Sequence, residues 1–131
     1  MKVYADSSAL AKLVLDEAES EALVAWLLET DAELYASELC ATELMRVVRR
    51  LDPERAPAVR EVMAACSILV LTPQAYDQAG RMQPDELRTL DALHLAAALL
   101  AGDELDGMLS YDSTLLAAAR EAGLEPIAPG R

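Results

Sequence analysis

Residues 2–10 of this chain have the sequence Lys2-Val3-Tyr4-Ala5-Asp6-Ser7-Ser8-Ala9-Leu10, in which a short apolar run closes on a carboxylate and two hydroxyls. The apolar run predicts a short strand. Aspartate and serine are typical of the position where a helix begins, because their side chains accept hydrogen bonds from the first backbone N–H groups. The segment therefore predicts a strand followed directly by a helix, with Asp6 at the junction.

The rest of the chain repeats this alternation. Strands are predicted at 34–36, 67–71, 107–110 and 125–128, and helices at 9–15, 17–30, 37–50, 58–66, 73–82, 88–101 and 113–122. Strands that alternate with helices predict an α/β fold, a three-layer α/β/α sandwich with a mostly parallel sheet of four or five strands. The functional crevice of such a sheet lies outside the carboxyl ends of its strands.

Length and composition predict a single domain over 1–131, because 131 residues, 53% of them hydrophobic, suffice for one core. No apolar run has the roughly 18 to 20 residues of a membrane span, and Asp6 interrupts the N-terminus too soon for a signal peptide. We therefore expect a cytoplasmic protein. Cys40 and Cys66 are far apart and the chain has one histidine, which favours reduced, buried thiols over a disulfide or a zinc site.

The net charge of −12, from 11 basic and 23 acidic residues, is the opposite of that of a generic nucleic-acid binder. A nuclease with this charge must attract phosphate through bound cations and a few local arginines, or have a basic partner that covers its acidic face.

Four acidic residues occupy positions that favour a shared site. Asp6 and Asp112 each follow a predicted strand, so both lie on the same rim of the sheet. Asp91 and Glu43 lie in helices with apolar neighbours, where a carboxylate needs a polar environment. Hard cations such as Mg²⁺ take oxygen ligands, so the four acids together predict a Mg²⁺ or Mn²⁺ site.

Each acid also has an ordinary interpretation. Asp6 and Asp112 fit helix caps, Asp91 fits the positive end of a helix dipole, and Glu43 fits a solvated helix face. Only their joint placement favours a metal site. His94, one turn after Asp91, is interpreted as a structural histidine and not as a ligand.

The segments that carry these acids resemble PIN domains in composition and order. They are Val3-Tyr4-Ala5-Asp6-Ser7-Ser8-Ala9-Leu10, Glu43-Leu44, Leu90-Asp91-Ala92-Leu93-His94-Leu95-Ala96 and Leu109-Ser110-Tyr111-Asp112. The resemblance spans nearly the whole chain. It is strongest to VapC toxins, which are single-domain endoribonucleases of bacterial toxin–antitoxin pairs that a VapB antitoxin neutralises.

The resemblance implies a PIN-like fold and assigns metal binding and catalysis to Asp6, Glu43, Asp91 and Asp112, with a supporting hydroxyl from Ser7 or Ser110. Some relatives carry a further acid after the last one, whereas residues 113–116 here are Ser-Thr-Leu-Leu, which argues against a second tightly held metal. The expected reaction is hydrolysis of RNA by a metal-activated water. Asp6 and Asp112 would be the main ligands, and Asp91 and Glu43 would complete the site or orient the water.

The expected partners are an RNA substrate, an antitoxin with a basic segment, and a second copy of the chain in a homodimer. An arginine of the antitoxin would take the place of the cation in the acidic crevice. Helix faces around Leu23, Trp26 and Leu27 offer apolar surface for such interfaces, although burial in the chain's own core is the favoured interpretation.

Three other functions fit the sequence less well. A phosphoacceptor receiver domain needs a late lysine, and the only lysines are Lys2 and Lys12. A phosphatase with an aspartate nucleophile commonly has a second aspartate two residues on, where this chain has Ser8. A non-catalytic PIN-fold interaction module would tolerate loss of the acids, and all four are present.

Overall fold

The computed structural model describes residues 1–131 and contains one five-stranded sheet. The strands are β1 (Lys2–Ala5), β2 (Glu33–Ser37), β3 (Ser67–Leu69), β4 (Gly107–Leu109) and β5 (Glu125–Ile127). Their order is β3-β2-β1-β4-β5, and every neighbouring pair is parallel. The sheet is therefore wholly parallel, with β1 at its centre.

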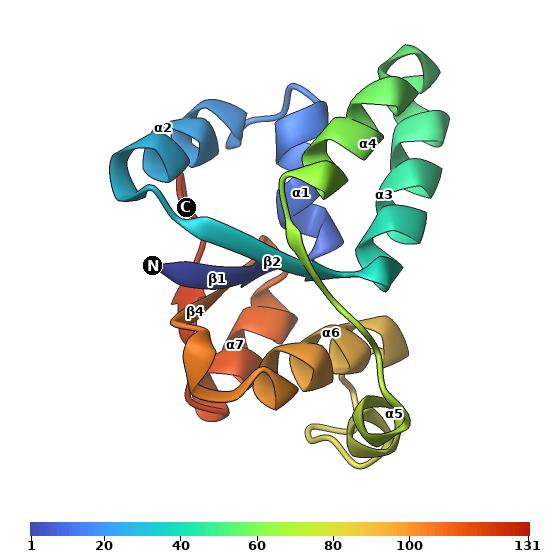
Figure 1. The fold of residues 1–131 in the computed structure, drawn as a ribbon, viewed down its shortest axis with the longest axis vertical. Coiled ribbons are helices and arrows are strands. Elements are labelled where there is room, and N and C mark those ends of the chain that lie inside the picture. The colour runs from blue at the N-terminus through green and yellow to red at the C-terminus, as the bar shows by residue number, and fades with distance from the viewer.

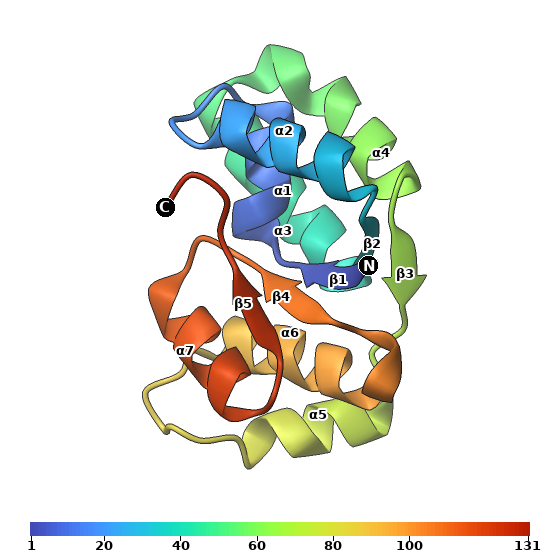
Figure 2. The same ribbon diagram turned by 90° about the vertical axis from the view of Figure 1, so that its left-hand side faces the viewer.

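Helices cover both faces of this sheet (Figures 1 and 2). One layer contains α1 (Ser7–Val14), α2 (Ser20–Thr30), α3 (Glu38–Leu51) and α4 (Ala56–Ala64), and the other contains α5 (Pro73–Gly80), α6 (Thr89–Leu100) and α7 (Ser113–Glu121). Short 3₁₀ turns at Pro53–Arg55 and Gly102–Glu104 complete the secondary structure. This arrangement confirms the predicted three-layer α/β/α sandwich.

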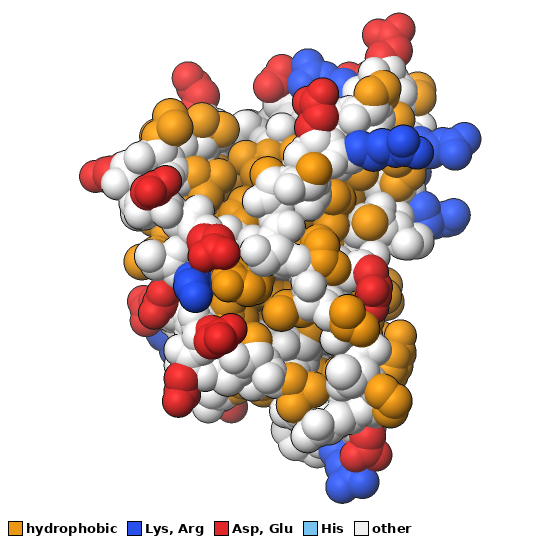
Figure 3. All heavy atoms as spheres, viewed as in Figure 1, with side chains coloured by type: hydrophobic (Ala, Val, Ile, Leu, Met, Phe, Trp, Pro, Cys, Tyr) orange, Lys and Arg blue, Asp and Glu red, His pale blue; other side chains and the backbone are white.

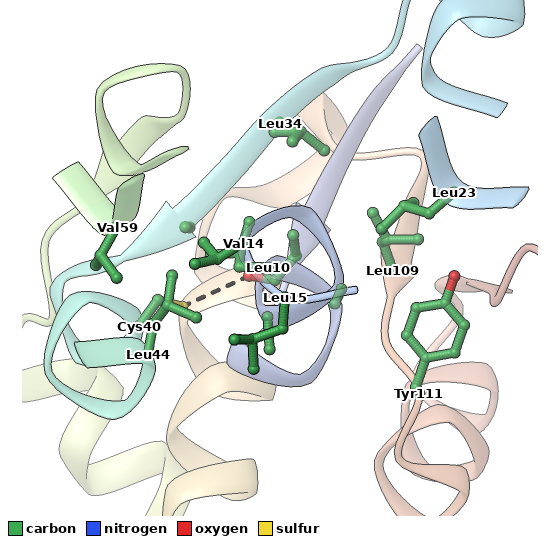
Figure 4. Close-up of a cluster of buried hydrophobic side chains, with 14 of the residues drawn as sticks. Leu10, Val14, Leu15, Leu23, Leu34, Cys40, Leu44, Val59, Leu109 and Tyr111 are labelled. Atoms are coloured by element: carbon green, nitrogen blue, oxygen red, sulfur yellow. Dashed lines mark hydrogen bonds between the residues drawn. The ribbon is translucent and has the colours of Figure 1, made fainter. Parts of the chain in front are cut away.

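The core has one hydrophobic cluster on each face of the sheet, because side chains alternate along a strand. In β1, Val3 and Ala5 belong to the cluster under α1 to α4, where Figure 4 shows Leu44 beside Cys40 and Leu109 beside Leu23. Tyr4 belongs to the cluster under α5 to α7 and is fully buried. Tyr4 therefore carries a hydroxyl group into the interior beneath the carboxyl edge of the sheet.

The predicted ends of most elements differ from the structure by one to three residues, and two of these differences have a clear local cause. The third strand ends at Leu69 and not at residue 71, and it is a half-exposed edge strand because it pairs only with β2. The helix predicted over 17–30 begins at Ser20, whose hydroxyl accepts a hydrogen bond from the Glu17 N–H and donates one to the Leu15 carbonyl. These bonds stabilise a turn in place of the first helical residues.

The three apolar residues of α2 singled out from the sequence pack into the chain's own core, as favoured there, whereas Val24 and Leu28 of the same helix are exposed. Leu23 is fully buried, and Trp26 and Leu27 pack against the same cluster. Cys40 is also buried, whereas Cys66 is half-buried and was expected to be buried; it lies beside the edge strand. No helix combines the length and apolar character that crossing a bilayer requires.

The connections reverse direction at β1. The chain moves from β1 to β2 and β3 on one side, then crosses to β4 and β5 on the other. The polypeptide segments after β1 and β4 therefore separate to opposite faces and leave a crevice at the carboxyl edge. The two segments still touch at its floor, where the Asp6 N–H donates to the Leu109 carbonyl at 3.2 Å.

Candidate active site

Asp6 lies at the floor of this crevice, directly after β1, and is 3% exposed. Its Oδ1 caps helix α1 by accepting a hydrogen bond from the Ala9 N–H at 3.1 Å, and its Oδ2 accepts one from the Ser110 hydroxyl at 2.8 Å. Burial raises the pKa of Asp6 above its usual value, although the bonds from Ser8, Ser110 and Ala9 oppose this. The carboxylate is thus both a helix cap and a buried acid, so the two sequence interpretations are compatible.

The supporting hydroxyls come from Ser110 and Ser8. Ser8 donates to Asp6 Oδ1 at 2.6 Å, and its oxygen accepts from the Tyr111 N–H at 2.9 Å. Ser7, which was expected as an alternative to Ser110, makes no side-chain hydrogen bond to Asp6. The reason is local geometry: Asp6 caps the helix, so the residue two positions later, and not its immediate neighbour, has its hydroxyl near the capping carboxylate.

Asp112 lies beside Asp6 on the crevice rim, two residues after the predicted strand end. It caps α7 through Oδ1, which accepts from the Leu115 N–H at 3.0 Å. Ser110 links the two aspartates, because its oxygen also accepts from the Asp112 N–H at 3.0 Å. The capping interpretation of Asp112 is therefore also correct, and it leaves Oδ2 for a second partner.

That partner is Arg88, which bridges two of the predicted acids. Its Nη2 donates to Asp112 Oδ2 at 2.7 Å, and its Nε donates to Asp91 Oδ2 at 3.2 Å. Asp91 is in the first turn of α6 and is 8% exposed. Burial and then the charge of Asp112 raise the pKa of Asp91, while Arg88 lowers it. The positive charge of Arg88 thus offsets the repulsion between the two carboxylates.

Glu43, in α3, is held by His94 of α6. Glu43 Oε1 and His94 Nε2 are 2.5 Å apart, and His94 is almost completely buried. On the other side of the ring, Nδ1 lies 2.7 Å from the Tyr4 hydroxyl, which donates to Ser37 Oγ at 3.0 Å. These contacts join β1, β2, α3 and α6 under the crevice.

The hydrogen-bond directions favour a protonated His94. The Tyr4 hydroxyl is placed to donate to Ser37, and in that arrangement His94 Nδ1 donates to Tyr4 while Nε2 donates to the carboxylate of Glu43. Burial alone lowers the pKa of His94, but the contacts with Cys40 and Glu43 outweigh it and raise this pKa to about 10. His94 is therefore a structural residue, as expected, and it also positions Glu43.

The four acids differ in how they face the crevice. Glu43 and Asp91 line one 240 Å³ hollow together with Arg88, Thr89 and Leu90. Asp91 and Asp112 share Arg88, and Asp112 and Asp6 share Ser110. No three acidic, imidazole or thiol side chains form a ready coordination shell.

The donor set nevertheless fits a hard divalent cation. Carboxylate oxygens are the ligands that Mg²⁺ and Mn²⁺ prefer, usually together with water. A cationic group already lies between Asp91 and Asp112, and it belongs to the exposed side chain of Arg88. Asp6, Asp91, Asp112 and Glu43 are the residues that would hold the ion.

Sequence reasoning missed Arg88, Ser8 and the link from Tyr4 to His94. Arg88 lies three residues before Asp91, a spacing that allows contact at the start of a helix and was an available signal. The contacts of Tyr4 with Ser37 and His94 join positions 33 and 90 residues apart, which no local pattern reveals.

Comparison with known proteins identifies relatives over the whole chain. Residues 3–121 match the model of the PIN domain. The chain is 37% identical to "Ribonuclease VapC35" of Mycobacterium tuberculosis over 132 aligned positions, 98% of each chain.

Solved structures with the same fold have low sequence identity to this chain. VapC20 of M. tuberculosis, described as a toxin that cleaves the sarcin-ricin loop, has a TM-score of 0.79 at 17% identity and covers 97% of this chain and 99% of its own. A chain of VapBC2 from Rickettsia felis, bound to a promoter DNA fragment, has a TM-score of 0.72 at 11% identity and covers 98% and 99%.

The bridging position of Arg88 predicts competition with a metal ion. Arg88→Gln should bind Mn²⁺ several-fold more tightly, because the competing charge is gone. In EDTA it should be less stable by no more than about 1 kcal/mol, since the Arg88 side chain is 76% exposed and screened by solvent. Calorimetric Mn²⁺ titration and thermal melts measure the two effects.

The matched control is Arg81→Gln, which removes the same charge from an exposed pair with Asp77 outside the crevice. Equal Mn²⁺ affinities for the wild type and both variants would contradict the competition.

Proposed function

This chain belongs to the PIN-domain family, and we propose that it is a metal-dependent endoribonuclease that serves as the toxin of a toxin–antitoxin pair. The observation that carries the proposal is that Asp6 and Asp112 follow β1 and β4 and share Ser110, while Arg88 bridges Asp112 to Asp91. Glu43 lines a hollow together with Asp91. The full-length likeness to a VapC ribonuclease supports the same reaction. Residues 1–131 would act as one nuclease domain.

The proposed cofactor is Mg²⁺ or Mn²⁺, held by the four acids. The carboxylate oxygens of these residues are the ligand type that such ions prefer. When bound, such an ion lowers the pKa of a coordinated water and stabilises negative charge on phosphate. Asp6, at the crevice floor, and Asp112, on its rim, would bind the ion directly or through water.

The remaining residues would orient the attacking water. Asp91 and Glu43 face a common hollow, and carboxylates there can accept a proton from water. His94 holds Glu43 by a hydrogen bond, and Ser8 and Ser110 hold Asp6 in the same way. These bonds fix the positions of both acids. No side-chain nucleophile is needed for this hydrolysis.

Purified protein should cleave single-stranded or loop regions of RNA only when Mg²⁺ or Mn²⁺ is present. The reason is that phosphate cannot approach an acidic rim in a protein of charge −12 without a cation. Gel analysis of a labelled RNA, with metal and with excess EDTA, measures this. Undiminished cleavage in EDTA would contradict the metal assignment.

Asp112→Asn should reduce cleavage by at least about 100-fold and shrink the Mn²⁺-induced rise in melting temperature. Stability in EDTA should change little, because the amide still caps α7, and the lost bond from Arg88 and the lost repulsion with Asp91 have opposite effects. Rate assays and thermal melts with and without Mn²⁺ measure both. A fully active variant with the wild-type metal response would restrict Asp112 to its capping role.

We further infer an antitoxin partner with a basic segment that enters the crevice. The contact of Arg88 with Asp91 and Asp112 supports the idea, because it is a guanidinium position between two acids. The fold is also found in a VapBC complex. The neighbouring gene product should co-purify with this chain and block cleavage, and charge reversal in its basic segment should abolish both effects. Binding that is indifferent to this reversal would contradict the inference.

The homodimer expected from the resemblance is a separate proposal, and light scattering of the free protein tests it.

A further inference from the structure

Three arginines gather on the solvent side of helix α3. Arg46, Arg49 and Arg50, here called the α3 arginine stripe, are exposed and, together with Met45, line a 490 Å³ hollow. The opposite side of the same helix is fully buried at Cys40, Leu44 and Val48. The stripe therefore lies on a rigid element that the core holds in place.

The stripe is unusual in this molecule because its charges are not neutralised. Five of the eleven basic residues form ion pairs, namely Lys12, Arg55, Arg81, Arg88 and Arg131. The remaining six are Lys2, Arg46, Arg49, Arg50, Arg60 and Arg120, so half of the unpaired cations lie within five consecutive residues. In Figure 3, several blue side chains project on the right over the region of α3, other blue side chains lie at the left and at the bottom, and red side chains are spread over the whole view.

The stripe is continuous with the candidate active site. Glu43 and Arg46 are one turn apart on α3, and Arg50 is one turn further along the same side of the helix. At 1.5 Å per residue, Arg50 lies about 10 Å from Glu43 along the axis. Because α3 begins directly after β2, it leads away from the carboxyl edge of the sheet.

Stabilisation of helix α3 does not explain why the three arginines are present. Arg49 and Arg50 are in the last turn, where a positive charge interacts favourably with the helix dipole. Arg46 lies before that turn. Like charges three and four residues apart repel, so the set of three costs the isolated helix stability.

We propose that the α3 arginine stripe binds the phosphate backbone of the RNA strand that enters the active site. The proposal rests on the ribonuclease function proposed above and adds the subsite that holds the substrate. Guanidinium groups bind phosphate oxygens through paired hydrogen bonds. The overall charge of −12 repels RNA, so binding depends on unpaired cations beside the acids.

The test compares two variants with the same net charge. Arg46→Gln/Arg50→Gln removes two charges from the stripe, and glutamine preserves helix propensity. Lys2→Gln/Arg120→Gln removes two unpaired charges at the start of β1 and near the end of α7, which lie toward the opposite edge of the parallel sheet. Binding of single-stranded RNA is measured by fluorescence anisotropy over a range of salt concentrations, with both pairs placed in the Asp112→Asn background and Mn²⁺ present. Cleavage kinetics are measured with the same variants in proteins that retain Asp112.

The stripe variant should bind RNA about tenfold more weakly than its parent. Its plot of log binding constant against log salt should be less steep by about 1.4, since each lost contact with a single strand contributes about 0.7. In cleavage assays KM should rise about tenfold while kcat changes far less, and the control variant should match the wild type.

Two results would overturn the proposal in distinguishable ways. A wild type that cleaves RNA, with a stripe variant that has the control's KM and salt dependence, would refute the subsite alone. A wild type that neither binds nor cleaves RNA with Mn²⁺ would refute the ribonuclease function and the subsite together.

Discussion

The parallel pairing of β1 with β4 is the constraint on which the site depends. It brings residues 104 positions apart, Asp6 and Ser110, within 2.8 Å of each other, and it places Asp112 on the same rim. Because β1 is the strand where the chain reverses direction, the helices after β1 and β4 lie on opposite faces, and the acids lie at the crevice between them.

Polar and charged groups that also hold the fold together stabilise the four acids. The two aspartates that follow strands cap helices, Ser110 joins them, and Arg88 neutralises the outer pair. Glu43 has the charge of His94 beneath it. Burial still raises the pKa of Asp6 and Asp91, and the charge of Asp112 adds to this at Asp91, so the folded protein retains an electrostatic cost that a bound cation would relieve. This cost is consistent with the ion-binding role proposed for the site.

The sequence predicted what depends on local patterns. The order of strands and helices, the parallel sheet and the capping positions of Asp6 and Asp112 follow from short segments, and the structure agrees. The bridge by Arg88 and the bonds of Tyr4 with Ser37 and His94 could not be predicted, because they depend on which helix packs beside which strand. The edge position of β3 was missed for the same reason: an apolar run is compatible with either a central or an edge strand.

The most direct test of the account is to locate Mn²⁺ by anomalous diffraction in crystals of the protein grown with the ion. The account predicts an anomalous peak in the crevice, coordinated by Asp6 and Asp112 directly or through water, with the Arg88 side chain moved away from Asp91. A peak elsewhere, or Mn²⁺ absent from the crevice while Arg88 keeps both bonds at saturating ion concentration, would contradict it.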